Sequence, residues 1–347
     1  MSDYTPEDTI FVQIASYRDP ELQWTLKDLF EKAKRPENIF VGICHQYDMK
    51  GDEDKHLFEI PFSHPKQLRI DEVDYRESQG CCWARNRVQK LWKGEKWTLM
   101  IDSHMRFEKY WDEILVINLK KQINKNNNKL LLTAYLPGYE YIDNKNIKYF
   151  TNLGSIKLLF DSEFIRCNGA NNIKNFSNIA GFSAHFAFTT SDFIKEIKYD
   201  PYLFFLGEEP TVAARLFTNG WNILCFNDII MYHLYNNREK KQKRQININN
   251  KNNNMSKLRQ HEIFNIKKID NEDALMDIKE YGLGNKRTLR DYERFSGVDF
   301  RRKITREHTK QGIFEEWQEV AKISNVKNVF NNIRNYYAQN SCLFFYR

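Results

Sequence analysis

The alternation of short apolar runs with amphipathic segments over the first 120 residues constrains the fold more than any other feature. Short apolar runs that end at polar residues are typical of buried strands, and apolar residues at helical spacing are typical of helices. The predicted strands are 9–16, 39–44, 68–73 and 99–101. The predicted helices are 22–33, 78–92 and 111–119. This order predicts an α/β fold with a mostly parallel sheet that starts at the N-terminus. Asp19 is the expected N-cap of the first helix, with Pro20 in its first turn.

Composition indicates a folded globule. The chain has 347 residues, of which 41% are hydrophobic and 14% aromatic, enough for one long domain or one domain with an appendage. The net charge of +7 comes from mixed charges, and its clearest basic run, 238–244, contains no aromatic residue. A solvated loop therefore explains the run better than a nucleic-acid surface, and we expect no nucleic-acid partner. The excess positive charge could still attract an anionic ligand such as a nucleotide.

Other segments bear on location and source. Asn-rich tracts at 124–129, 171–178 and 245–254 predict surface loops, and are typical of an AT-rich coding genome in a eukaryote or in a large virus infecting one. The acidic N-terminus is not a signal peptide and no run is long enough to span a bilayer, so a cytoplasmic protein with no membrane partner is expected. Six cysteines without paired spacing predict reduced thiols. They are Cys44, Cys81, Cys82, Cys167, Cys225 and Cys342.

Asp102 and His104 directly follow the apolar run 99–101. In open α/β sheets ligands bind just beyond the carboxyl ends of the strands. Residues two apart on an extended backbone point to the same side, and a carboxylate with an imidazole suits a divalent metal such as Mn²⁺. An isolated motif of this kind is more often a polar turn at a strand end.

Four further features lie at expected strand ends or at a helix start. They are Ser16–Asp19 after the first strand, His45–Asp48 after the second, Gly80–Arg85 at a helix start, and His233 after a later apolar run. Gly80 would allow close backbone approach, and a helix N-terminus favours an anion such as phosphate. Taken alone, a histidine at a strand end is more often structural and a helical arginine more often solvated. The ordered set favours a nucleotide site with a metal.

The same motifs resemble a known family, the cytoplasmic polypeptide α-N-acetylglucosaminyltransferases. The resemblance rests on residues 13–20, Gly80 with 83–85, 102–107 with 111–112, 232–235, 281–287 and 291–300, and so covers the chain from residue 9 to about 300. Known members attach N-acetylglucosamine to hydroxyproline on a ubiquitin-ligase adaptor protein. The mucin-type polypeptide N-acetylgalactosaminyltransferases are similar more distantly, through the Asp-x-His motif, Gly80–Arg85 and the segments 180–188, 205–209 and 215–221.

The resemblance implies a GT-A fold, a Rossmann-like, mostly parallel sheet that binds a nucleotide-sugar, with a helical C-terminal extension. It implies that Asp102, His104 and His233 hold Mn²⁺ or Mg²⁺. The residues implied to bind the UDP-sugar donor are Ser16, Arg18, Asp48, Gly80, Arg85, Asp102 and Ser103. Glu208 and Glu209 would contact hydroxyls of the sugar or acceptor; the alternative is a charged helix N-terminus. We expect Trp221 in the core and His185 in a structural role.

The expected boundaries follow from the same comparison. The catalytic domain would span 1–235, with a nucleotide and metal half at about 9–120 and an acceptor half at about 130–235. An Asn/Lys-rich loop at 236–256 would precede a helical extension at 257–347, which ends in the aromatic tail 342–346. The tail could dock on its own domain or on a second chain, which leaves an oligomer open.

The implied function is a metal-dependent, retaining transfer of N-acetylglucosamine from UDP-N-acetylglucosamine to a polypeptide hydroxyl, on hydroxyproline, Ser or Thr. One alternative keeps the fold but uses another UDP-sugar (glucose, galactose or N-acetylgalactosamine) or a glycan acceptor. An alternative of another class is a non-catalytic protein that binds a nucleotide or glycan.

Overall fold

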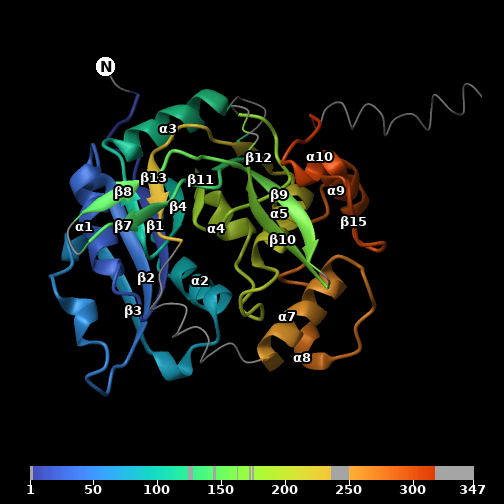
Figure 1. Cartoon of the computed structure of the whole chain (residues 1–347), viewed down its shortest axis with the longest axis horizontal. Helices are drawn as coiled ribbons and strands as arrows, with labels where there is room; N and C mark the ends of the chain where they lie inside the picture. Colours follow the sequence, from blue (N-terminus) through green and yellow to red (C-terminus); the bar gives the residue numbers. More distant parts are fainter. Residues whose placement is uncertain are drawn as a thin grey trace, which may run out of the picture.

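A computed structural model describes residues 3–123, 128–143, 146–161, 163–171, 173, 176–235 and 250–316 (Figure 1). Its centre is a seven-stranded sheet in the order β12-β6-β11-β4-β1-β2-β3. Six of these strands run parallel and β11 runs antiparallel to both neighbours. The strands are β1 (Ile10–Tyr17), β2 (Ile39–Tyr47), β3 (Leu68–Asp74), β4 (Trp97–Asp102), β6 (Leu130–Thr133), β11 (Phe186–Thr190) and β12 (Asn222–Cys225). The predicted mostly parallel α/β sheet is confirmed.

The first helices lie where the periodicity predicts them, as α1 (Leu22–Lys32), α2 (Cys81–Gln89) and α3 (Trp111–Gln122). The prediction that Asp19 caps α1 is wrong, because the N-cap is Glu21. α2 begins three residues later than predicted, since Gly80 has a φ of +106°, which no helical residue adopts. β1 is shifted by one residue from the predicted 9–16, and β2 is longer than predicted and includes His45.

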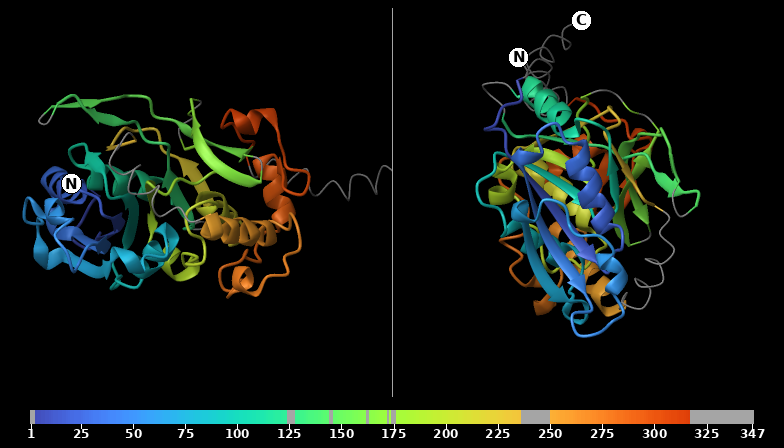
Figure 2. Two further views of the ribbon diagram at one scale, coloured as in Figure 1. Left: turned by 60° about the horizontal axis from the view of Figure 1, so that its bottom comes forward. Right: turned by 90° about the vertical axis from the view of Figure 1, so that its left-hand side faces the viewer.

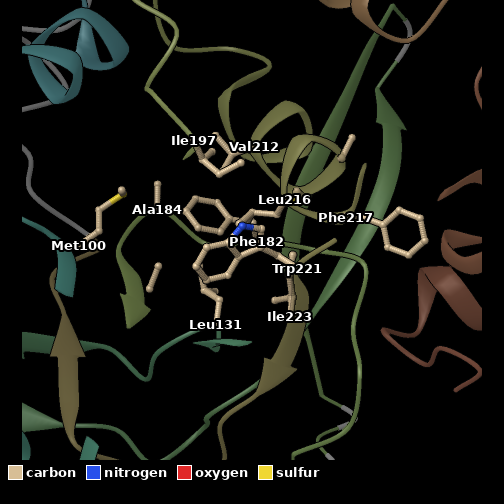
Figure 3. Packing of buried hydrophobic residues seen from close by; sticks show 14 of the residues in the cluster. Met100, Leu131, Phe182, Ala184, Ile197, Val212, Leu216, Phe217, Trp221 and Ile223 are labelled. Carbon is tan, nitrogen blue, oxygen red and sulfur yellow. The ribbon is translucent and has the colours of Figure 1, made fainter. Parts of the chain in front are cut away.

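The sheet separates two hydrophobic clusters because successive side chains of a strand point to opposite faces. On one face, Val12 and Ile14 pack with apolar residues of α1 and α3. On the other face, Phe11 packs with α2 and α5 (Glu208–Thr218). Figure 3 shows part of this second cluster, where Trp221, fully buried, lies among residues from the sheet and α5, as its predicted core position requires.

Three short antiparallel pairs complete the described part of the chain before residue 236. They are β5 (Met105–Phe107) with β13 (Met231–His233), β7 (Tyr139–Tyr141) with β8 (Ile147–Tyr149), and β9 (Ser155–Asp161) with β10 (Phe164–Ala170). The remaining helix here is α4 (Asp192–Glu196). Short 3₁₀ turns lie at Pro36–Asn38, Lys55–Phe58, Pro65–Gln67 and Tyr75–Glu77.

The C-terminal part packs on the opposite side of the molecule from β3 (Figure 1). Tyr292 donates to the Ala180 carbonyl at 2.6 Å, and Ser155 of β9 donates to the Gly312 carbonyl at 3.0 Å, so this part also borders the β9–β10 hairpin (Figure 2). It contains α7 (Asn250–Ile263), α8 (Glu272–Leu275), α9 (Leu289–Ser296), α10 (Glu307–Lys310) and the strands β14 (Val298–Asp299) and β15 (Ile304–Thr305).

Two expectations for this part need correction. The segment predicted as a loop through residue 256 is helical from Asn250 onward, and the extension includes the β14–β15 pair as well as helices. The basic run 238–244 and the aromatic tail 342–346 lie outside the described residues. Among the helices that are described, none has the length and apolar character needed to cross a bilayer.

Candidate metal centre and adjoining cavity

Asp102, His104 and His233 converge at the carboxyl end of β4. The chain bends after Asp102 and continues as β5, which pairs with β13 so that Met105 lies opposite His233. His233 Nε2 lies 3.1 Å from Asp102 Oδ2, and His104 Nε2 lies 3.6 Å from the same oxygen. Potential ligand atoms of the three residues all fall within 4.8 Å of one another. The predicted set is therefore brought together.

The chemistry of this cluster suits a divalent cation. Burial by itself would raise the pKa of Asp102, but the hydrogen bond with His233 and the charges of His104 and Arg85 outweigh it and hold that pKa well below its ordinary value. Asp102 is therefore a carboxylate at neutral pH. One carboxylate and two imidazoles, with the Asp102 side chain 26% exposed, form a ligand set that leaves room for further ligands.

Arg85 connects this cluster to the start of α5. Its Nη2 donates to Asp102 Oδ1 at 2.7 Å, and its Nε lies 3.0 Å from Glu208 Oε1. The side chain is 3% exposed, and Nη1 has no hydrogen-bond partner among the described residues. A buried guanidinium with an unused donor is suited to an anionic ligand.

Glu208 and Glu209 form the first turn of α5, after Gly207 as N-cap. The two residues start a helix, as the alternative reading expected, and they also line a cavity, while their contact with sugar or acceptor hydroxyls stays a prediction. Burial raises the pKa of Glu209 to about 8, although the Ala184 N–H, which donates to its Oε1 at 2.9 Å, lowers it. At neutral pH Glu209 is therefore mainly protonated and can donate a hydrogen bond as well as accept one.

A cavity of about 370 Å³ opens beside the metal cluster. Six of the predicted site residues line it, and the others do not. These six are Arg85, Asp102, His104, Glu208, Glu209 and His233, and His185 also lines the cavity. The β10 residues Ile165–Asn168 form another wall, for which the sequence contains no periodic or motif signal.

An aromatic wall also borders the cavity. The rings of Tyr135 and Tyr235 stack with centroids 5.5 Å apart, and His185 packs edge-on against Tyr135 at 5.1 Å. His185 Nδ1 lies 2.8 Å from Ser183 Oγ, while its Nε2 accepts from the Leu136 N–H at 3.2 Å. Burial lowers the pKa of His185 well below its ordinary value. His185 is thus neutral, and both ring nitrogens are engaged within the protein. Tyr135 lies in no motif, so the sequence did not indicate it as a cavity residue.

Three residues predicted to bind the donor lie at the ends of β1 and β2 rather than in the cavity. Arg18 pairs with Asp54 at 2.9 Å, and Asp48 pairs with Arg76 at 3.0 Å. Ser16 is fully buried, and its Oγ has no hydrogen-bond partner in the described part of the chain. β1 lies next to β4, with Ala15 paired with Asp102, and β2 lies on the other side of β1.

Gly80 and Ser103 also stay outside the cavity lining. Ser103 is 2% exposed and its hydroxyl bonds the Asp19 carboxylate. At the start of α2, the Cys81 N–H donates to the Phe204 carbonyl at 2.8 Å, so this amide is already occupied in the protein. A Cβ on Gly80 would lie 2.4 Å from the Phe204 oxygen, which explains why glycine occupies this position.

We expect Gly80→Ala to lower the free energy of unfolding by about 1–3 kcal/mol, because alanine adds a backbone clash to an unfavourable φ. The matched control is Gly94→Ala, since Gly94 has the same φ of +106° but nothing within 4 Å of a Cβ. Urea unfolding of both variants separates the cost of the clash with Phe204 from the cost of the unfavourable φ. Equal losses in the two variants would show that contact with Phe204 is unimportant.

The chain was compared with known proteins. A family model described as Glycosyltransferase (GlcNAc) matches residues 9–59 and 51–302. No curated protein sequence matches. The structure of GalNAc-T7 with UDP, GalNAc and Mn²⁺ is similar with a TM-score of 0.53 at 15% identity, covering 74% of this chain and 48% of that one. This chain thus spans about half the length of GalNAc-T7.

A second solved structure is the mannosyltransferase PcManGT from Pyrobaculum calidifontis with GDP-Man and Mn²⁺. It aligns with a TM-score of 0.46 at 13% identity, over 80% of this chain and 71% of that one. The architecture is the GT-A fold, as predicted. Since the family model matches well over half of the chain, this protein belongs to the GlcNAc glycosyltransferase family.

Proposed function

We propose that this protein is a metal-dependent, retaining glycosyltransferase that moves N-acetylglucosamine from UDP-N-acetylglucosamine to a hydroxyl of a polypeptide. The observation that carries the proposal is that Asp102, His104, His233 and Arg85 line one cavity together with Glu208 and Glu209. Family membership supports the reaction class and the sugar.

In this proposal Asp102, His104 and His233 hold Mn²⁺ or Mg²⁺. The ionised carboxylate and the paired imidazoles fit such an ion, and GalNAc-T7 was solved with UDP and Mn²⁺. When bound, the ion supplies Lewis-acid stabilisation of the diphosphate leaving group. Arg85 adds a second positive charge from α2, and its free Nη1 donor is available to a phosphate oxygen.

The other cavity residues would position the sugar and acceptor. Glu208 and Glu209 are placed to hydrogen-bond hydroxyl groups, and protonated Glu209 can do so as a donor. Tyr135 and Tyr235 offer ring faces beside them. Ser16, Arg18 and Asp48 remain proposed contacts for the uridine end, beyond the cavity.

That the sugar keeps its configuration at the anomeric carbon is implied by the family resemblance. In a front-face transfer, the bond from the anomeric carbon to the phosphate oxygen breaks and a bond to the acceptor oxygen forms on the same face. The acceptor proton passes to the departing phosphate. Such a reaction depends on positioning and electrostatics, which Arg85 and the glutamates would provide.

The test is UDP release from a panel of UDP-sugars with Mn²⁺ or Mg²⁺. We expect turnover of UDP-N-acetylglucosamine that stops when EDTA removes the metal and returns when Mn²⁺ is added in excess. Turnover of UDP-glucose, UDP-galactose or UDP-N-acetylgalactosamine instead would show that the proposed donor sugar is wrong. UDP binding by calorimetry without turnover, even with hydroxyproline, Ser and Thr peptides added, would support a non-catalytic binding protein.

A further inference from the structure

Asp19 contacts His104 from behind the metal cluster. The Asp19 side chain is fully buried, and its Oδ2 lies 2.9 Å from His104 Nδ1. The Ser103 hydroxyl bonds the same oxygen, and the Glu21 N–H donates to Oδ1 at 3.3 Å. Asp19 does not line the cavity. The carboxylate before α1 is therefore anchored to the turn between β4 and β5.

This contact determines which nitrogen of His104 carries the proton and which carries the lone pair. A carboxylate only accepts hydrogen bonds, so His104 Nδ1 must carry the proton in that bond. A histidine that binds a cation must be neutral, and with the proton on Nδ1 its lone pair lies on the other nitrogen. That other nitrogen, Nε2, is the one 3.6 Å from Asp102 Oδ2. Asp19 thus presents the correct nitrogen and also restrains rotation of the ring.

We propose that Asp19 is a positioning residue, which orients His104 and thereby sets the affinity of the site for a divalent cation. The inference rests on the proposed metal site. Carboxylates that accept from the second nitrogen of a ligand histidine typically contribute 10–100-fold to metal affinity. The sequence indicated a helix cap at this position, where the N-cap is in fact Glu21, and only the contact between residues 19 and 104 reveals the positioning role.

The first experiment titrates Mn²⁺ alone into the full chain and measures free Mn²⁺ by electron paramagnetic resonance. We expect Asp19→Asn to bind Mn²⁺ about 10–100-fold more weakly than the wild type. Asparagine keeps the shape of the side chain, but its neutral amide gives a weaker acceptor and can also donate. Unchanged Mn²⁺ affinity in folded Asp19→Asn would overturn the inference.

Asp112→Asn is the matched control. Asp112 is equally buried and accepts from the Lys34 and Arg35 N–H groups at 2.7 and 2.9 Å, and it is not a member of the metal cluster. We expect this variant to lose stability but to keep wild-type Mn²⁺ affinity. Equal loss of affinity in both variants would assign Asp19 a general structural role and contradict the proposal.

A measurement on the wild type does not depend on how a variant folds. Long-range ¹H–¹⁵N spectra of the metal-free chain at pH 8 report the tautomer of each histidine, and His104→Gln assigns the signal. We expect the Nδ1–H tautomer for His104, and an Nε2–H tautomer would overturn the proposal. If the wild type bound no Mn²⁺ while showing the Nδ1–H form, the metal-dependent function would fail instead.

Discussion

Asp102→Asn is expected to reduce metal-dependent turnover of the donor by at least about 10³-fold, because losing the ion removes several kcal/mol of transition-state stabilisation. Asp102 is the carboxylate between both imidazoles, with His233 Nε2 at 3.1 Å. Asparagine keeps its volume and removes its charge. Initial rates of UDP release across a range of Mn²⁺ concentrations, with Mn²⁺ affinity measured separately, give the result.

The control for this variant is Asp71→Asn. Asp71 is 23% exposed and pairs with Arg87 of α2 at 2.6 Å, much as Asp102 is 26% exposed and pairs with Arg85 of the same helix at 2.7 Å. Asp71 neither lines the cavity nor belongs to the metal cluster. We expect its variant to retain wild-type turnover. A rate for Asp102→Asn within tenfold of wild type at saturating Mn²⁺ would contradict the proposed ligand set.

Arg85→Met is expected to lower the free energy of unfolding by about 3–5 kcal/mol, the usual effect of removing one partner from a buried ion pair. Without the guanidinium, the carboxylates of Asp102 and Glu208 lose their shared counter-ion in a setting where burial already raises the pKa of Glu208. Methionine preserves much of the length and packing of the side chain. Urea unfolding measures the change.

Two further variants separate charge from packing. Arg87→Met removes the neighbouring pair with Asp71, where the arginine side chain is 36% exposed, and should cost about 0–1 kcal/mol. Adding Glu208→Gln to Arg85→Met should recover part of the lost stability, because it removes one unpaired buried charge. If Arg85→Met were no more destabilising than Arg87→Met, the linking role of Arg85 would be wrong.

Local patterns predicted most of the nucleotide half of the sheet. The apolar runs at 39–44 and 99–101 lie within β2 and β4, and Leu22, Leu26 and Leu29 are buried on α1. Helix starts were less predictable. α2 begins at Cys81 because Gly80 contacts the Phe204 backbone, more than 120 residues away.

The metal cluster was predictable to different degrees. Asp102 and His104 are neighbours in the sequence, so their proximity follows from local geometry, while His233 was assigned through family resemblance. Its position beside them depends on the pairing of β13 with β5, which no local pattern determines. Ser103 was predicted to bind the donor, but its hydroxyl bonds Asp19. This contact joins residues far apart in the sequence, so no local pattern could predict it.

The sequence by itself determined the alternation of strands and helices, the strand-end position of Asp102 and the residue types that suit a divalent ion, because these depend on periodicity and side-chain chemistry within short windows. Only the tertiary structure decided the antiparallel placement of β11, the wall formed by β10, the stacking of Tyr135 on Tyr235, and the contact of Asp19 with His104. Each of these joins segments distant in the chain, and such contacts are selected by the packing of the whole core.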